Sequence, residues 1–301
     1  MRLLRTLKEW LFYGHVWIAL AAAGLGWMSL QLAGYDVKLL PDLHVSVPLM
    51  LFFATFGIYT LHRLISFRKA KSLPATKRYR LVAKYPLFSL LTGMCSLILA
   101  ASLAVVFLEA IWKTLVCAGF FTVFYLIPPL PGYRRLRDLP YVKVLWVAIA
   151  WTLVTHDIPL RMADHIISDS GLHLPQPSSY NYISEYIVRF LFTLCIALLF
   201  DLRDVELDKS QGVKTVANSF GRKLSPIVTV LLISSAVISF GYARTGVVPD
   251  PLSIALSLTY LVCLPLGIRT IDKRDEDWYA IVVNGMLLLP PIATAIVVGF
   301  S

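Results

Sequence analysis

Apolar positions in this chain are gathered into long runs, and polar positions fall into shorter segments between them. A helix that crosses a bilayer needs about 20 mostly apolar residues, and nine runs have roughly that length. Their expected bounds are 11–32, 45–62, 86–108, 110–130, 140–157, 184–200, 225–243, 251–268 and 278–299. The pattern therefore predicts an all-α membrane protein with nine transmembrane helices, in which residues 1–301 form a single transmembrane domain.

The composition supports this interpretation and excludes several protein classes. Residues of the AVILMFWYC set make up 57% of the chain and charged residues 15%, whereas ordinary soluble domains are roughly 25% charged. A soluble domain of this size cannot cover its surface with so few polar residues. The four cysteines lie in apolar runs and form no CxxC pair. We therefore expect neither disulfides nor a zinc or iron–sulfur site.

The distribution of positive charge predicts the orientation. The chain has 28 Lys and Arg and 18 Asp and Glu, a net charge of +10. If the N-terminus is cytoplasmic, most of these cations lie in inside segments, and only Lys38, Arg161 and Arg244 lie in outside loops. Because cytoplasmic loops of helical membrane proteins collect Lys and Arg, the charge does not indicate nucleic acid binding. It predicts an integral protein of an inner or plasma membrane with its N-terminus inside and its C-terminus outside.

The first apolar run follows a short cationic segment, as the core of a signal peptide does. However, the run 11–32 is long enough to span a bilayer and longer than the apolar core of a typical signal peptide. We therefore expect it to be retained as the first helix.

Two inside loops, 63–85 and 201–224, are long and polar, and they follow the second and the sixth predicted helix. Arg63 and Asp204, at equivalent places in these loops, are 141 residues apart (204 − 63). This spacing hints at an internal duplication. On the outside, 159–182 is the one long loop, and its Pro and Ser residues predict a surface excursion with room for a short amphipathic helix.

The chemistry-bearing stretch lies at the inner end of the sixth predicted helix. Asp201, Asp204 and Asp208 are spaced i, i+3, i+7, so on a helix the three carboxylates share one face. Such carboxylates repel one another unless a cation neutralises them, and a Mg²⁺ ion shared with a diphosphate is one arrangement that uses this spacing. A solvated helix end with balanced charges is the alternative, because Arg203 and Lys209 lie between and beside the aspartates. After the helix, Gly212 and Lys214 begin a G-x-K-T stretch that can turn the backbone toward a phosphate.

Two segments resemble those of the UbiA superfamily of intramembrane prenyltransferases. Residues 201–221 read DLRDVELDKSQGVKTVANSFG, which is similar to the second aspartate-rich motif of that family, close to DxRDxExDxxxGxxTxxxxxG. Residues 124–151 resemble the family's segment between the fourth and fifth helices, where Lys143 occupies the place of a phosphate-facing lysine. The resemblance implies a helical bundle around a central cavity that opens to the cytoplasm.

The first aspartate-rich motif of the family, NDxxDxxxD, should close the second helix, and this chain departs from it. On the most natural alignment Tyr59 replaces Asn, Thr60 and Arg63 replace Asp, and Phe67 replaces the last Asp. No carboxylate occurs anywhere from Val45 to Tyr85. In the family both motifs hold Mg²⁺ between protein and diphosphate, so half of the metal cage is missing here.

Three interpretations of Arg63 follow. Its guanidinium can bind diphosphate oxygens directly and replace one metal ion with a fixed positive charge. Alternatively, the chain has lost the ionisation chemistry and is a lipid-binding or scaffolding relative. In the third interpretation, Arg63 is an ordinary inside cation whose side chain extends to the helix end.

The resemblance implies a prenyltransferase that transfers an isoprenoid chain from a polyprenyl diphosphate to a lipophilic or aromatic acceptor, although the lost motif leaves an impaired relative as the alternative. It implies catalytic, metal-binding roles for the three aspartates and Mg²⁺ as the cofactor. The implied diphosphate-binding residues are Arg63, Tyr133, Arg137, Lys143, Lys209 and Lys214. A transporter is a third class, with few of its usual signs.

A second acidic cluster precedes the ninth predicted helix and consists of Asp272, Asp275, Glu276 and Asp277. Because cations alternate with these residues, a solvated loop is the simpler expectation. One of the carboxylates can also substitute for a ligand that the first motif lacks.

Overall fold

The computed structural model describes residues 2–35, 38, 40–69, 76–130, 132, 133, 135–171, 182–210, 212–242, 250–273 and 275–300. Every regular element among these residues is a helix. The prediction of an all-α protein is therefore confirmed.

Long helices account for most of the chain. They are α1 (Arg2–Tyr13), α2 (Val16–Leu32), α3 (Pro41–Lys69), α5 (Pro86–Ala104), α6 (Leu108–Leu126), α9 (Tyr182–Ser210), α11 (Ser225–Tyr242), α12 (Pro251–Thr270) and α15 (Leu289–Phe300). Two rods are composite: α7 (Lys143–Thr152), the π-helix η3 (Leu153–Asp157) and α8 (Ile158–Ser170) form one, and α13 (Glu276–Trp278), the π-helix η5 (Tyr279–Val283) and α14 (Asn284–Met286) lead into α15. Short helices follow α3 and α9, namely α4 (Lys77–Lys84) and α10 (Val216–Phe220).

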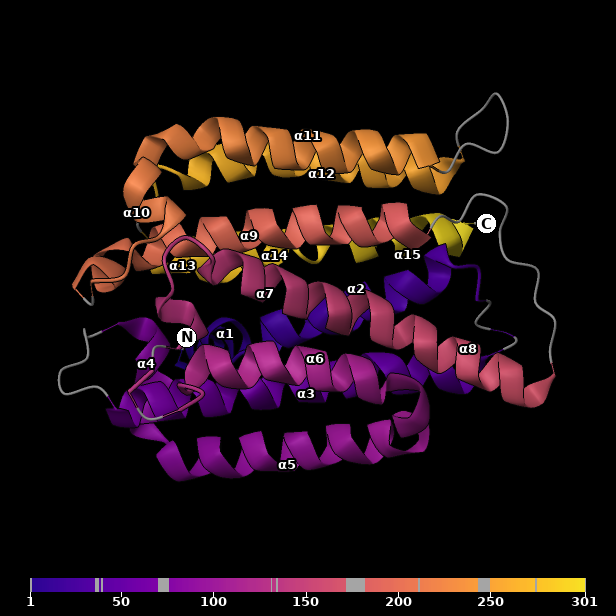
Figure 1. Ribbon diagram of the computed structural model, residues 1–301, viewed down its shortest axis with the longest axis horizontal. Helices are drawn as coiled ribbons and strands as arrows, with labels where there is room; N and C mark the ends of the chain where they lie inside the picture. Colours follow the sequence, from indigo (N-terminus) through magenta and orange to yellow (C-terminus); the bar gives the residue numbers. More distant parts are fainter. Residues whose placement is uncertain are drawn as a thin grey trace.

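Six helical stretches among the described residues are long and apolar enough to cross a membrane. One of them, Pro86–Tyr125, contains both α5 and α6, which run in opposite directions and are joined by the 3₁₀ turn η1 (Val105–Phe107) (Figure 1). The protein is thus an integral membrane protein, and the count of nine spans stays a prediction.

The helices lie roughly parallel in a layered bundle (Figure 1). The central helix α9 packs against α7, α10 and α11, and α12 links α11 to α15. On the other side α2 packs against α3, α8 and α15, and α5 covers α3. Helices α1, α4, α10 and α13 gather at one end of the bundle, and α15 ends at the other (Figure 1).

Helices α3 and α9 occupy corresponding places along the chain. Each continues past its apolar run into a long polar segment, and Arg63 and Asp204, which are 141 residues apart (204 − 63), lie in these continuations. A short helix at the same end of the bundle follows each (Figure 1). The regularity supports the internal duplication that the sequence hints at, and it places Thr60, Arg63 and Phe67 where α9 has its three aspartates.

The segments expected as long loops are largely helical. α3 and α9 continue to Lys69 and Ser210, beyond their apolar runs, because a helix that leaves the membrane can continue with polar side chains. The outer segment 159–182 is expected to be a surface excursion with room for a short amphipathic helix, and residues 159–170 belong to α8, in which Leu160, Met162 and Ala163 are buried. Burial of these side chains against α2 and α6 stabilises the helix beyond the polar sequence that suggested a loop.

Glycines allow close contact between α3 and α5. A Cβ on Gly57 would lie 2.8 Å from Leu97 Cδ2 and 2.9 Å from the carbonyl oxygen of Gly93. We expect Gly57→Ala to lower the free energy of unfolding by about 1–3 kcal/mol, because backbone on the partner helix must move. Thermal unfolding in detergent, followed by tryptophan fluorescence, measures this change. Gly119→Ala on α6 is the control, because nothing lies within 4 Å of its new Cβ. Equal stability of both variants would contradict the account.

Candidate functional site

A cavity of about 330 Å³ lies inside the bundle, toward the end that carries α4, α10 and α13. One part of its lining is charged and comprises Arg63, Arg137, Lys143, Asp201, Arg203, Asp204 and Glu276. The rest is largely apolar and aromatic and includes Tyr59, Phe121, Tyr125, Trp146, Trp151 and Phe200. The cavity therefore has one charged corner and a mostly apolar body.

Lys143, the first residue of α7, connects two of the three aspartates on α9. Its Nζ lies 2.8 Å from Asp201 Oδ1 and 2.7 Å from Asp208 Oδ2, and all three side chains are buried. Burial of these three charged groups is tolerable because the ammonium group pairs with both carboxylates. The ammonium group thus lies where a cation was expected between the carboxylates.

The end of α9 and the turn after it fix the place of Asp208. Gly212 has φ 69, its N–H donates to the carbonyl of Lys209, and the N–H of Val213 donates to that of Asp208. This is the glycine-dependent helix stop in which a left-handed residue lets the last carbonyls be satisfied. The G-x-K-T stretch begins with this turn.

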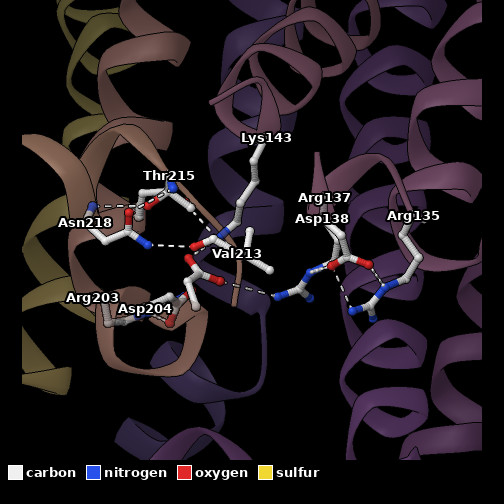
Figure 2. A network of polar contacts seen from close by, with 11 residues as sticks. Arg135, Arg137, Asp138, Lys143, Arg203, Asp204, Val213, Thr215 and Asn218 are labelled. Atoms are coloured by element: carbon white, nitrogen blue, oxygen red, sulfur yellow. Dashed lines mark hydrogen bonds and ion pairs between the residues drawn. The ribbon is translucent and has the colours of Figure 1, made fainter. Parts of the chain in front are cut away.

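The same turn is tied to the rest of the site. Thr215 and Asn218 cap α10 reciprocally, and Asn218 Nδ2 donates to the carbonyl of Val213 at 2.7 Å (Figure 2). The N–H of Tyr141, two residues before Lys143, donates to the carbonyl of Lys214 at 3.0 Å. These bonds hold the start of α7 against the end of α9.

Arg137 reaches the site from the segment between α6 and α7. Its Nη2 lies 4.0 Å from Asp208 Oδ1, and the neighbouring Asp138 pairs with Arg135 at 2.7 Å (Figure 2). Burial alone would lower the pKa of Arg137, but Tyr125, Asp208 and Asp204 outweigh it and raise the pKa. The guanidinium therefore stays charged beside the cavity.

The remaining wall of the charged corner comes from α3 and α9 in equivalent positions. Asp204 pairs with Arg203 at 3.1 Å on α9, and Arg63 on α3 stacks over the ring of Tyr79 of α4, 5.3 Å from its centroid. His62 also lines the cavity. Arg63 on α3 and Asp204 on α9, at equivalent positions of the two helices, thus line the same cavity.

The second acidic cluster proves to be structural and to adjoin the cavity. Asp277 accepts a hydrogen bond from Tyr13 and pairs with Lys77 Nζ at 2.8 Å. Glu276 accepts a hydrogen bond from the backbone N–H of Lys77 at 2.7 Å and lines the cavity. The cluster therefore joins α1, α4 and α13 across this end of the bundle.

The carboxylates fit one Mg²⁺ ion that is shared with a diphosphate. No group of three or more metal-ligating side chains is found in the described part of the chain. However, Asp201 and Asp204 both line the cavity, and Asp201 Oδ2 is buried without a hydrogen-bond partner. Mg²⁺ is commonly held by one or two carboxylates together with substrate phosphates. The facing part of α3 has no carboxylate, so a second ion of the same kind does not fit.

Six of the nine site residues expected from the sequence surround this corner. Arg63, Arg137, Lys143, Asp201 and Asp204 line the cavity, and Asp208 lies behind Lys143. By contrast, Tyr133, Lys209 and Lys214 are exposed and lie outside the described cavity lining, with Lys209 3.9 Å from Glu206. Roles for these three in diphosphate binding stay predictions.

Sequence reasoning missed several residues of the cavity wall. Trp146 and Trp151 lie in the segment that carries the family resemblance, and their spacing on one helix was a usable signal. His15 and Asn284 were overlooked, because each is a single polar residue inside an apolar run.

Comparison with known proteins gives likeness of structure only. No protein-family model matches the sequence, and no curated protein matches it. A UbiA homolog from Archaeoglobus fulgidus bound to GPP and Mg²⁺ is similar in structure, with 15% identity, a TM-score of 0.58, and coverage of 97% of this chain and 99% of the other. A structure of digeranylgeranylglyceryl phosphate synthase has 13% identity, a TM-score of 0.53, and coverage of 97% and 98%. The chain thus has the UbiA fold over nearly its whole length, and the resemblance noted in the sequence is confirmed for the fold.

Proposed function

We propose that this chain is a membrane prenyltransferase that transfers an isoprenoid chain from a polyprenyl diphosphate to a lipophilic or aromatic acceptor. One observation carries the proposal: one cavity joins a corner of cations and carboxylates to an apolar, aromatic body. A molecule with an anionic head and an apolar tail matches both parts. Structures with the same fold bind GPP or DMAPP together with Mg²⁺.

The head of the donor binds at the charged corner. Arg63, Arg137 and Lys143 present positive charge to the cavity from three different segments, and guanidinium groups bind phosphate oxygens in a bidentate manner. Asp201 and Asp204 would hold Mg²⁺ on the α9 side, and the bound ion would neutralise charge on the diphosphate. On the α3 side Arg63 supplies positive charge in place of a second ion.

The chain's own residues then favour loss of the diphosphate. The cations of the charged corner stabilise the negative charge that develops on the departing diphosphate, and this stabilisation is larger in a water-poor site than in water. The aromatic rings of Tyr59, Tyr125 and Trp151 face the cavity and can stabilise the allylic cation by cation–π interaction. The apolar wall keeps water away from that cation.

The cavity faces the cytoplasm in this proposal. The end of the bundle that carries the charged corner also carries α4 and α10, in the two segments where the sequence concentrates Lys and Arg. The positive-inside bias supports an orientation with the N-terminus inside and the C-terminus outside, in an inner or plasma membrane.

A specific observation favours a second candidate, a catalytically impaired relative that binds isoprenoid lipid or acts as a membrane scaffold. Lys143 already pairs with Asp201 and Asp208, and α3 contributes no carboxylate at the cavity. Such a protein would bind a polyprenyl diphosphate without releasing diphosphate in the presence of any acceptor, and the enzyme would release it.

Arg63→Gln tests the proposed head-group site. Hydrogen bonds to charged groups contribute about 1.5–3 kcal/mol, so we expect the affinity for geranylgeranyl diphosphate to fall about 10- to 100-fold. Titration of the purified protein with the donor, read as thermal stabilisation, measures the change. Arg68→Gln is the matched control, because Arg68 lies on the same helix but is exposed and outside the described cavity lining. Wild-type affinity in Arg63→Gln would identify Arg63 as an ordinary inside cation.

A further inference from the structure

His15 is a buried histidine at the corner between α1 and α2. It is 7% exposed, it lines the cavity, and its backbone has φ 66, in the left-handed region. The preceding Gly14 makes the corner possible, because a Cβ there would lie 2.3 Å from the carbonyl oxygen of Trp10. Non-glycine residues in this conformation are uncommon and tend to occur at functional sites.

The two ring nitrogens of His15 differ in their surroundings. Nδ1 lies 3.3 Å from Thr60 Oγ1, on α3, whereas Nε2 is buried without a hydrogen-bond partner. When Nδ1 accepts from the Thr60 hydroxyl, Nε2 carries the ring proton and donates a hydrogen bond. Thr60 therefore orients a donor N–H in the cavity wall.

Asn284 presents an unpaired acceptor, its side-chain carbonyl oxygen. It is 9% exposed and lines the cavity from α14, directly after the π-helix η5. Its Nδ2 donates to the carbonyl of Ala280 at 3.2 Å, which fixes the orientation of the amide, and its Oδ1 is buried without a partner. π-Helical turns inside α-helices often occur at functional sites.

The two residues belong to the same wall. α14 packs against α2, and the cavity lining includes Ile18 and Ala22 on α2 beside Ala280 and Leu287 on the other rod. In this apolar wall His15 and Asn284 are the polar members, and buried polar groups normally have partners. Their unpaired atoms indicate a ligand that supplies the missing hydrogen bonds.

We propose that His15 and Asn284 form an acceptor subsite that binds a hydroxyl group of the prenyl acceptor. A hydroxyl group can donate its proton to Asn284 Oδ1 and accept a hydrogen bond from His15 Nε2–H, so the pair favours an alcohol or phenol over an ether, a ketone or an unsubstituted ring, none of which can donate. The aromatic side chains of the cavity body suit a hydroxyarene in particular. This inference rests on the proposed function, because it names the class of acceptor that the same cavity takes.

Paired probes test the subsite without the donor. The quantity compared is the ratio of the Kd of naphthalene to the Kd of 2-naphthol. We expect this ratio to be about 2- to 10-fold larger in the wild type than in a protein without the subsite, because the probes differ by the hydrogen bonding of one hydroxyl group. Tryptophan fluorescence quenching measures both affinities. The variants Asn284→Leu and His15→Phe should each lose most of this preference, and His44→Phe, a change at a buried histidine outside the described cavity lining, should keep it. All proteins are measured in the same detergent, so partition of the probes into micelles affects every Kd ratio equally and cancels when the proteins are compared.

The outcomes separate this inference from the proposed function. Thermal stabilisation by geranylgeranyl diphosphate reports the donor site and should persist in Asn284→Leu, which also shows that the variant is folded. A hydroxyl preference that persists in both variants, or that is absent in the wild type, overturns the subsite. Absence of donor stabilisation in the wild type overturns the proposed function. The hydroxyl preference and its loss in the variants then decide separately whether the subsite exists.

Discussion

Replacing Lys143 with methionine is expected to lower the free energy of unfolding by about 3–5 kcal/mol and to abolish donor binding. The substitution leaves Asp201 and Asp208 buried without the ammonium group that lies 2.8 and 2.7 Å from them. Removing one partner of a buried ion pair is costly, because the remaining charge is no longer compensated. Thermal unfolding and titration with geranylgeranyl diphosphate measure the two effects.

Two further variants separate charge from packing at Lys143. Lys143→Arg keeps the charge and should retain much of the stability, although the planar guanidinium fits the two carboxylates differently. Adding Asp208→Asn to Lys143→Met removes one uncompensated carboxylate and should recover part of the loss. Wild-type stability of Lys143→Met would show that the ion pairs do not hold the ends of α7 and α9 together.

The second large effect is expected far from the charged corner, at Arg189. This side chain is fully buried on α9 and pairs with Glu185 at 3.2 Å. It also donates to Ser29 Oγ on α2 and to the carbonyls of Leu25 and Thr155. Arg189 therefore joins α2, η3 and α9 through charge-assisted hydrogen bonds.

Arg189→Met should lower the free energy of unfolding by about 3–5 kcal/mol, because it removes the buried positive charge that compensates Glu185 and the hydrogen bonds to the carbonyls of Leu25 and Thr155. Arg189 lies outside the described cavity lining, so donor affinity measured well below the melting temperature should change little. Arg222→Gln is the control: Arg222 pairs with Asp272 at 2.9 Å, both side chains are exposed, and such pairs contribute about 0–1 kcal/mol. Equal losses in the two variants would contradict a special role of the buried network.

The helical architecture could be predicted from the sequence because a bilayer permits few alternatives. Backbone groups in the membrane must be satisfied within the segment, so each long apolar run becomes a helix. The prediction stopped where the apolar runs stopped. Consequently it missed that α3 continues to Lys69 and α9 to Ser210, since tertiary contacts and not hydropathy sustain those turns.

The candidate site was predictable where residues share one helix. The spacing of Asp201, Asp204 and Asp208 placed three carboxylates on one face, and the corresponding places of α3 and α9 along the chain explain why Arg63 faces the same cavity. The partners of these residues come from distant segments, as in the bridge by Lys143 and the contact of Thr60 with His15. Such pairings depend on helix packing, which no local pattern encodes.

The central claim is that this cavity binds a polyprenyl diphosphate by its head with help from Mg²⁺. Thermal unfolding of the purified protein with geranylgeranyl diphosphate, with and without Mg²⁺, tests it most directly, because a ligand at 100 times its Kd stabilises the folded state by about 2.7 kcal/mol. We predict a rise in melting temperature that is larger with Mg²⁺ and whose Mg²⁺-dependent part is lost in Asp204→Asn. An unchanged melting temperature under every condition would contradict the claim.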